Sequence, residues 1–395
     1  MRCRILMLSV AHGGNVLPWV GLATELAHRG HQVSFTTTDQ FAEALNVDGL
    51  EVLRYNSSPQ PPLRDDPGQF SKHMWRIDEN SAIAEAVKTR FTDTRPDVIL
   101  YDSSAFHAGR IFARNWRVPY VKLSAGFVSG PLYSVEVDVK NRPLAGGSNN
   151  AASFGDSLIR TGRLICDYGQ DIGVDDWLFM PFEELTVSTL PRELQIAGDA
   201  FDEHWVFAGP FLDDRAFQGQ WQPPNEDPVL LVSFGSSNYK GQRAFLETCV
   251  SAFAGLDWHV VISTGPHLDP AELGPLPPNI EAHQQVPQLA ILKKAKLFIS
   301  HGGLGGILEA LSLGVPILAF PQLPEHHIAG DRITELGLGR TAELDISADD
   351  LKAAVLDLAA DASTADSLSQ MREHIQKAGG AARAAEEIEL YVIRG

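Results

Sequence analysis

Short apolar runs alternate with longer amphipathic stretches along most of the chain. In the first half, the apolar runs lie at residues 4–10, 33–38, 50–55, 97–102 and 118–123. Runs of this length without a polar face are typical of strands that are covered by helices on both sides. A helix is expected over residues 17–29, with Pro18 near its first turn and Gly30 as its stop. Strands that alternate with helices predict a mostly parallel sheet joined by right-handed crossovers.

The same alternation begins again after a polar, proline-bearing stretch at residues 209–225. Further buried strands are expected at residues 228–233, 258–263, 297–300 and 315–320. Helices are expected at residues 243–256, 307–313, 366–377 and 381–391. We interpret the chain as α/β, with two Rossmann-like domains that face each other. The expected boundaries are 1–208 for the N-terminal domain, 209–227 for the linker, 228–380 for the C-terminal domain and 381–395 for a closing helix.

Two stretches depart from this regular pattern. Residues 56–67 are rich in proline and serine, and residues 130–155 are rich in glycine, asparagine and serine. Both are expected to be irregular. Long irregular insertions in a compact domain tend to be functional or mobile.

The charge balance narrows the choice of partners. Among 395 residues, 32 are Lys or Arg and 50 are Asp or Glu, which gives a net charge of −18. This balance argues against nucleic acid and anionic membrane surfaces, whose binding depends on cationic residues. No apolar run reaches the ~20 residues of a membrane helix. Three well-separated cysteines and the absence of CxxC or HExxH spacing favour a cytoplasmic protein without a disulfide framework or a metal site.

The densest chemical signal follows the expected strand at 297–300. His301 is followed by a glycine-rich turn that reaches Gly306, and then by a helix that carries Glu309. A glycine turn that opens a helix exposes unpaired N–H groups at the positive end of the helix, where phosphate binds well. Glu309 is placed to accept hydrogen bonds from ribose hydroxyls. Ser236 and Ser237 end the first strand of the same domain and are expected at the same crevice. Each feature alone is common in α/β domains; their order and spacing together favour a nucleotide site.

The segments VPQLAIL, FISHGGLGGILEAL, GVPILAFPQ and ELGLGR, read in this order, resemble the nucleotide-sugar motif of family 1 glycosyltransferases. The pattern is most similar to the bacterial macrolide-glycosyltransferase branch of that family. The resemblance runs from Ile5 to the segment AGGAARAAEEIE near the end of the chain. It implies the GT-B fold, in which two Rossmann-like domains face across a crevice and a C-terminal helix packs back on the N-terminal domain.

The resemblance also implies a role for each matching residue. Gln285 and Val286 would hold the pyrimidine base, Glu309 the ribose, and Glu325 with His326 the sugar hydroxyls. The diphosphate would be held by His301, Gly303, Gly305 and Gly306, assisted by Ser236 and Ser237. Three positions depart from the family: Gln285 replaces a common aromatic base-stacker, Gly305-Gly306 replaces an Asn-Ser pair, and Glu325-His326 replaces an acidic-Gln pair.

The family places a catalytic histidine after the first strand and a partner aspartate after a later one. Asp102 matches the aspartate, but alignment on Pro18 puts Asn15 where the histidine belongs. Asparagine cannot act as a base. Three alternatives remain for the deprotonation of the acceptor. His12 could act as the base, or Asp102 could do so directly or through water. In the third alternative, the acceptor needs little deprotonation. The structural alternative is that His12 caps local backbone and Asn15 caps a helix. His107 is a weaker candidate.

Aromatic residues in or beside the two irregular stretches suggest an apolar acceptor. They are Phe70, Trp75, Phe106, Phe127, Tyr133 and Phe154, of which Trp75, Phe106, Phe127 and Tyr133 are the candidate acceptor-binding residues.

The activity that the resemblance implies is inverting, metal-independent transfer of a hexose, such as glucose from UDP-glucose, to a small lipophilic natural product. The nucleotide sugar is a cosubstrate, and no bound cofactor is expected. One alternative is a TDP-deoxysugar transferase of antibiotic biosynthesis, and another is a non-catalytic binding protein of the same fold. A nicotinamide oxidoreductase is disfavoured, because neither glycine turn reads GxGxxG. A monomer or homodimer is expected.

Overall fold

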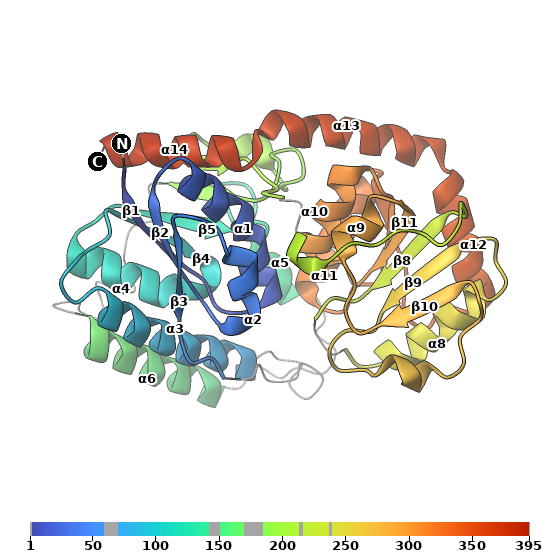
Figure 1. The fold of residues 1–395 in the computed structure, drawn as a ribbon, viewed down its shortest axis with the longest axis horizontal. Helices are drawn as coiled ribbons and strands as arrows, with labels where there is room; N and C mark the ends of the chain where they lie inside the picture. The colour runs from blue at the N-terminus through green and yellow to red at the C-terminus, as the bar shows by residue number, and fades with distance from the viewer. Residues whose placement is uncertain are drawn as a thin grey trace.

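The computed structural model contains two parallel β-sheets, each covered by helices (Figure 1). The structure describes residues 2–58, 70–141, 151–169, 185–212, 216–236 and 239–394. The two sheets form two lobes that lie side by side, with the N-terminal half of the chain in one lobe and the C-terminal half in the other (Figure 1). The expected α/β class with two Rossmann-like domains is confirmed.

The first sheet has seven strands, in the order β3-β2-β1-β4-β5-β6-β7. Its strands are β1 Arg4–Leu8, β2 Gln32–Thr37, β3 Leu50–Arg54, β4 Val98–Asp102, β5 Tyr120–Ser124, β6 Thr186–Ser188 and β7 Trp205–Phe207. All pair in parallel, and β1 lies between β2 and β4. Because the chain moves outward in opposite directions from β1 and β4, a crevice opens at the carboxyl ends of these two strands.

The second sheet has six parallel strands, in the order β10-β9-β8-β11-β12-β13. Its strands are β8 Val229–Ser233, β9 His259–Ser263, β10 Ile280–His283, β11 Ala295–Ser300, β12 Ile317–Ala319 and β13 Gly339–Thr341. Every residue of β8 and β9 is buried, as expected for strands with helices on both faces. Here the direction reverses between β8 and β11, which places the equivalent crevice after Ser233 and Ser300.

Helices cover both faces of each sheet. Those of the first half are α1 Gly13–His28, α2 Asp39–Ala42, α3 Phe70–Arg90, α4 Phe106–Trp116, α5 Val135–Asn141 and α6 Ala151–Tyr168. Those of the second half are α8 Gln242–Phe253, α9 Gln288–Leu292, α10 Leu304–Leu313, α11 Pro324–Glu335, α12 Ala348–Ala360, α13 Ala362–Ala378 and α14 Gly380–Arg394. Short 3₁₀ turns lie at Glu43–Leu45, Ser103–Ala105, Gly198–Ala200, Ala216–Gln218 and Pro270–Leu273. In the described ranges, no helix is both long and apolar enough to cross a bilayer.

The first helix begins earlier than the expected residue 17. α1 begins at Gly13, and His12 is its N-cap, with Nδ1 accepting a hydrogen bond from the Gly14 backbone N–H. The glycines therefore belong to the first turn of the helix instead of to a separate loop. Pro18 lies inside the helix, where it offers no N–H to the preceding turn. The interpretation of Asn15 as the N-cap is wrong, and that of His12 as a cap is confirmed.

The second of the two stretches expected to be irregular contains helical residues. α5 and the first residues of α6 lie within residues 130–155, whereas α3 begins at Phe70, after the first stretch, so Trp75 and Phe154 lie on helices. Asparagine, serine and glycine in residues 130–155 lower helix propensity, but tertiary packing overrides propensity: α6 packs against both α3 and α4. Residues 59–67 and 142–150, which belong to the same two stretches, lie outside the described residues.

The closing helix α14 lies along the N-terminal lobe and packs against α1, whereas α13, which precedes it, packs on α10 of the C-terminal lobe (Figure 1). Ile388 joins the hydrophobic core of the N-terminal lobe, where it is 1% exposed. The Glu389 carboxylate accepts hydrogen bonds from Arg29 and from His31 Nε2 at 3.0 and 2.7 Å. The expected packing of the C-terminal helix on the N-terminal domain is therefore confirmed.

Truncation of Ile388 should destabilise the protein through this contact. Ile388→Ala is expected to cost about 2–5 kcal/mol of the free energy of unfolding, because it leaves a cavity between α14 and α1. Ile393 lies on the same helix and is 63% exposed, so Ile393→Ala should change stability by no more than about 0.5 kcal/mol. Denaturant unfolding of both variants tests the difference. Equal effects would mean that α14 does not dock in solution as described.

Candidate active site

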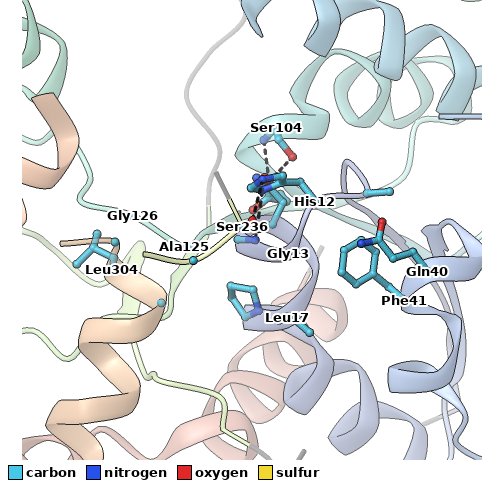
Figure 2. Close-up of a pocket in the computed structure, with 18 of the residues that line it drawn as sticks. His12, Gly13, Leu17, Gln40, Phe41, Ser104, Ala125, Gly126, Ser236 and Leu304 are labelled. Carbon is cyan, nitrogen blue, oxygen red and sulfur yellow. Dashed lines mark hydrogen bonds between the residues drawn. The ribbon is translucent and has the colours of Figure 1, made fainter. Parts of the chain in front are cut away.

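A cleft of about 2550 Å³ separates the two lobes and is lined by residues of both. The carboxyl ends of β1 and β4 open into it from one side, and those of β8 and β11 from the other. Figure 2 shows His12 and Gly13 at the start of α1 on one side and Leu304 at the start of α10 on the other. Two long helices therefore begin at this cleft, and their positive ends favour an anionic ligand there.

The glycine turn after β11 forms the C-terminal wall of this cleft. Gly303 is the N-cap of α10, and a Cβ on it would lie 2.4 Å from the Nε2 of His301. Gly302 has a φ of +87°, and a Cβ there would lie 3.1 Å from the His326 carbonyl oxygen. Both positions therefore require glycine. A Cβ on Gly305 would meet open space, so the backbone at this point is accessible from the cleft.

His301 is surrounded by other rings. Its ring centroid lies 4.7 Å from that of His326 and 5.6 Å from that of Tyr239. Burial, followed by the neighbouring His326, holds the pKa of His301 well below its ordinary value. The imidazole is therefore neutral at neutral pH, and its contribution to a phosphate would be a hydrogen bond and not a full charge.

The residues expected to hold the sugar lie in the first turn of α11. Glu325 is half-buried and lines the cleft. His326 is 7% exposed, and its ring packs edge-on against His301 and Tyr239. The two neighbours in sequence thus differ in environment: Glu325 has the more accessible side chain, and His326 is mostly buried next to the glycine turn.

Glu309 lies 3% exposed on α10 and still lines the cleft. Its Oε2 accepts a hydrogen bond of 2.7 Å from Gln288 Nε2, at the start of α9. Sequence reasoning missed Gln288, although it belongs to the quoted segment VPQLAIL. A buried carboxylate with an amide donor beside it presents both an acceptor and a donor, which matches the hydroxyls of a ribose.

The remaining residues expected at the nucleotide lie along the same wall. Val286 is half-buried and packs against the core of the C-terminal lobe, whereas Gln285 is exposed. Both line the cleft. Ser236 is exposed at the end of the loop after β8. Ser237 lies outside the described residues.

On the opposite wall, Asp102 ends β4 and is 1% exposed. Its carboxylate accepts four hydrogen bonds. Oδ1 accepts from Asn15 Nδ2 at 3.0 Å and from the backbone N–H and the hydroxyl of Ser104, and Oδ2 accepts from Trp19 Nε1 at 2.9 Å. Asn15 therefore occupies the place of a base that would be oriented by this carboxylate, but it supplies an amide. Sequence reasoning missed Trp19 and Ser104.

His12 lies at the N-cap of α1 and lines the same side of the cleft. Because its Nδ1 accepts from the Gly14 N–H, the ring hydrogen of the neutral form is on Nε2. Nε2 lies 3.4 Å from the hydroxyl of Ser236, on the other lobe (Figure 2). The weaker candidate His107 lies in the first turn of α4, where its ring contacts that of Phe106.

A buried network supports the turn that precedes His12. The Tyr55 hydroxyl accepts a hydrogen bond of 2.6 Å from the Ala11 N–H and donates one of 2.9 Å to Glu79. Glu79 is 1% exposed and also accepts from the Ser58 N–H. Burial and the adjacent Glu79 raise the pKa of Tyr55, so its hydroxyl keeps its proton at all physiological pH values. The network holds the turn after β1 against α3.

The four candidate acceptor residues lie in different surroundings. Trp75 on α3 and Phe127 after β5 line the cleft, and Trp75 Nε1 donates to the Ser58 carbonyl at 2.9 Å. Phe106 begins α4, where the Arg110 guanidinium lies 4.7 Å from its ring centroid. The Tyr133 hydroxyl donates to Asp138 at 3.0 Å, next to α5. Of the aromatic residues named from the sequence, Trp75 and Phe127 are thus the ones that the described cleft wall contains.

Comparison with known proteins identifies relatives for this arrangement. Residues 247–388 match the family model described as "Erythromycin biosynthesis protein CIII-like, C-terminal domain". The chain is 34% identical to an oleandomycin glycosyltransferase of Streptomyces antibioticus, over 98% of this chain and 90% of the relative. It is 30% identical to an NDP-glycosyltransferase of Bacillus subtilis, over 98% and 97% of the two chains.

Solved structures agree with these relatives. The crystal structure of a calicheamicin glycosyltransferase is 36% identical and superposes with a TM-score of 0.81, over 100% of this chain and 99% of the other. A glycosyltransferase from Streptomyces nogalater, at 20% identity and a TM-score of 0.70, shares the fold over 99% and 100% of the two chains. With relatives of 30–36% identity along nearly its whole length, the chain belongs to the bacterial macrolide-type branch of the family 1 GT-B glycosyltransferases.

Proposed function

We propose that this glycosyltransferase moves a hexose, such as glucose from UDP-glucose, to a small lipophilic natural product whose nucleophile ionises without help from the enzyme. The observation that carries the proposal is the hydrogen bond from Asn15 to Asp102, on the wall of the cleft opposite the glycine turn. An amide accepts no proton near neutral pH, and both oxygens of the buried Asp102 already accept hydrogen bonds. Phenols, enols and carboxylic acids lose their proton far more readily than aliphatic alcohols, so they need general-base catalysis least.

The cleft wall formed by the glycine turn and the start of α10, which we call the nucleotide wall, supports a reaction that inverts the anomeric carbon without a metal ion. The start of α10 offers backbone N–H groups at Gly305 and the neutral ring of His301 to a diphosphate leaving group. Fixed dipoles of this kind stabilise negative charge as it develops, which is the task a divalent cation performs elsewhere. Direct displacement then inverts the anomeric carbon as the acceptor oxygen attacks from the opposite lobe.

The acceptor wall supports an apolar aglycone. Trp75 and Phe127 line it, and aromatic side chains offer large apolar areas of defined shape. Two relatives are named as an oleandomycin glycosyltransferase and a calicheamicin glycosyltransferase, and a lipophilic natural product is the acceptor class that we propose here.

A TDP-deoxysugar is the second candidate donor. The family's acidic-Gln pair is Glu325-His326 here, and the His326 ring packs against His301 and Tyr239. His326 therefore packs against neighbouring rings at a position where the family's glutamine would bind sugar hydroxyls. A sugar with fewer hydroxyls loses less from this change.

The proposed function is tested by turnover. The protein is incubated in the presence of EDTA with UDP-glucose or TDP-sugars and with matched phenolic and aliphatic-alcohol acceptors, and acceptor mass is followed by mass spectrometry. A hexose added to the phenol, and much less to the alcohol, is the expected result. Addition from TDP-deoxysugars alone would select the second donor. Nucleotide binding without any transfer would favour the non-catalytic alternative.

Glu309→Gln should weaken nucleotide binding. Loss of a charged acceptor for the ribose hydroxyls is expected to lower the affinity for UDP or TDP about 10- to 100-fold, since hydrogen bonds to charged groups are worth about 1.5–3 kcal/mol. Glu335→Gln is a control at an exposed position of α11 and should leave the affinity unchanged. Isothermal titration calorimetry measures both. Unchanged affinity in Glu309→Gln would remove the ribose role.

Asn15→His should create the missing base. Because Asn15 lies 3.0 Å from the Asp102 carboxylate, a histidine there would be oriented by Asp102 and would accelerate transfer to aliphatic alcohols by about 10²-fold or more. Transfer to phenols should change little. Adding Asp102→Asn should remove the gain, provided that the melting temperature of the double variant shows a folded protein. An equal gain with both acceptor classes would contradict the proposal.

A further inference from the structure

His12 stands where the turn after β1 meets the loop after β8. Its backbone belongs to the N-terminal lobe, where it caps α1. Its Nε2 lies 3.4 Å from the hydroxyl of Ser236 on the C-terminal lobe (Figure 2). We infer that His12 is a donor-phosphate residue that reaches across the cleft to the leaving diphosphate, and that it is not the acceptor base. This inference rests on the proposed nucleotide-sugar donor.

The hydrogen bonds of the ring determine which nitrogen is the donor. A backbone N–H can only donate, so Nδ1 of His12 must accept from Gly14. The hydrogen of the neutral ring is then on Nε2, the nitrogen that faces Ser236. To act as a base through Nε2, the ring would first have to move its hydrogen to Nδ1 and give up the cap of α1.

Ser236 lies next to the glycine turn after β11, where we propose that the diphosphate binds. Strands β8 and β11 pair in register up to Ser233 and Ser300, so the loops that follow them start side by side. A Cβ on Gly235 would lie 3.0 Å from Cε1 of His301. Ser236 therefore lies next to the glycine turn, and the Nε2–H of His12 points at the same place from the other lobe.

The carboxylate that would orient a catalytic histidine is engaged elsewhere. The hydrogen bonds to Asp102 come from Asn15, Trp19 and Ser104. Asn15 lies one helical turn further along α1 than His12 and takes the place beside Asp102. The two residues thus divide the cleft: Asn15 faces the acceptor side, and His12 faces the donor.

The transfer of the sugar needs no proton transfer to or from His12. An acceptor that has already lost its proton to solvent attacks the anomeric carbon, and the new carbon–oxygen bond forms as the bond from that carbon to the β-phosphate oxygen breaks. The leaving nucleoside diphosphate takes the electron pair of the broken bond. The Nε2–H of His12 would hydrogen-bond to an oxygen of the β-phosphate as its charge grows, which lowers the barrier and ties the two lobes to the same anion.

Two substitutions of His12 distinguish its proposed hydrogen bond to the diphosphate from its role as the N-cap of α1. Asparagine is a good N-cap, so His12→Asn should preserve α1, but its amide is too short to reach the position of Nε2. Glutamine has an amide nitrogen that reaches about as far as Nε2 and can donate from there. Calorimetric titration with UDP and TDP, together with kcat and KM for the donor, is carried out on both variants and on the original protein, with melting temperatures as the folding control.

The inference predicts opposite behaviour of the two variants. His12→Asn should bind the nucleotide about 10- to 100-fold more weakly at an unchanged melting temperature, as expected for loss of a hydrogen bond to a charged group. His12→Gln should keep the affinity within about fivefold and retain transfer. If His12 were the base, both variants would bind nucleotide normally and both would lose kcat. If it were only a cap, His12→Asn would behave normally in binding and turnover.

These outcomes are distinct from failure of the proposed function. If the original protein binds neither UDP nor TDP, the nucleotide-sugar proposal itself fails. If it binds one of them and His12→Asn binds it equally well, only the role of His12 is overturned.

Discussion

The buried carboxylate of Asp102 joins the elements that form the N-terminal wall of the cleft. It receives hydrogen bonds from α1 through Asn15 and Trp19 and from the turn before α4 through Ser104. A buried carboxylate must be matched by donors, because an unpaired charge in the interior is strongly unfavourable. The start of α1 is therefore fixed against the end of β4. His12, the N-cap of the same helix, has its Nε2 3.4 Å from the hydroxyl of Ser236 on the other lobe.

The two lobes place a similar feature, the start of a helix, at the cleft. Each contributes a helix that begins at the carboxyl edge of a parallel sheet, α1 after β1 and α10 after β11. The helix starts face the same cleft, so the cleft attracts anions even though the chain carries a net charge of −18. Contacts outside the cleft keep the lobes in place: α14 packs on α1, and Arg332 of α11 donates to the backbone carbonyls of Glu193 and Leu194. A closed and water-poor donor site needs such a fixed relation between the lobes.

The cleft wall of the C-terminal lobe was largely predictable because the residues expected there lie close together in the sequence. Residues 285–309 contain the positions expected for the base, the diphosphate and the ribose, and all of them lie in or next to the unit of α9, β11 and α10, whose geometry is local. Even there, Gln288 was missed, because its role is visible only from its contact with Glu309. The acceptor wall was less predictable. Asn15 meets Asp102 across 87 positions, and Tyr55 reaches Ala11 across 44, so no local pattern indicates either pair. Helices α5 and α6 were also not predicted, because the elements against which they pack are distant in sequence: α11 for α5, and α3 and α4 for α6.

By itself, the sequence determined the α/β class, the two-domain order of strands and the glycine turn that opens α10, since apolar periodicity and glycine placement are properties of neighbouring residues. It also determined that Asn15 stands where a base is expected. Only the tertiary structure decided that α1 begins at Gly13, that Asn15 rather than His12 faces Asp102, and that His12 faces Ser236. The reason is physical: which side a polar group near a helix start faces is decided by the donors and acceptors that other elements bring within hydrogen-bond distance, and those elements are brought together by folding.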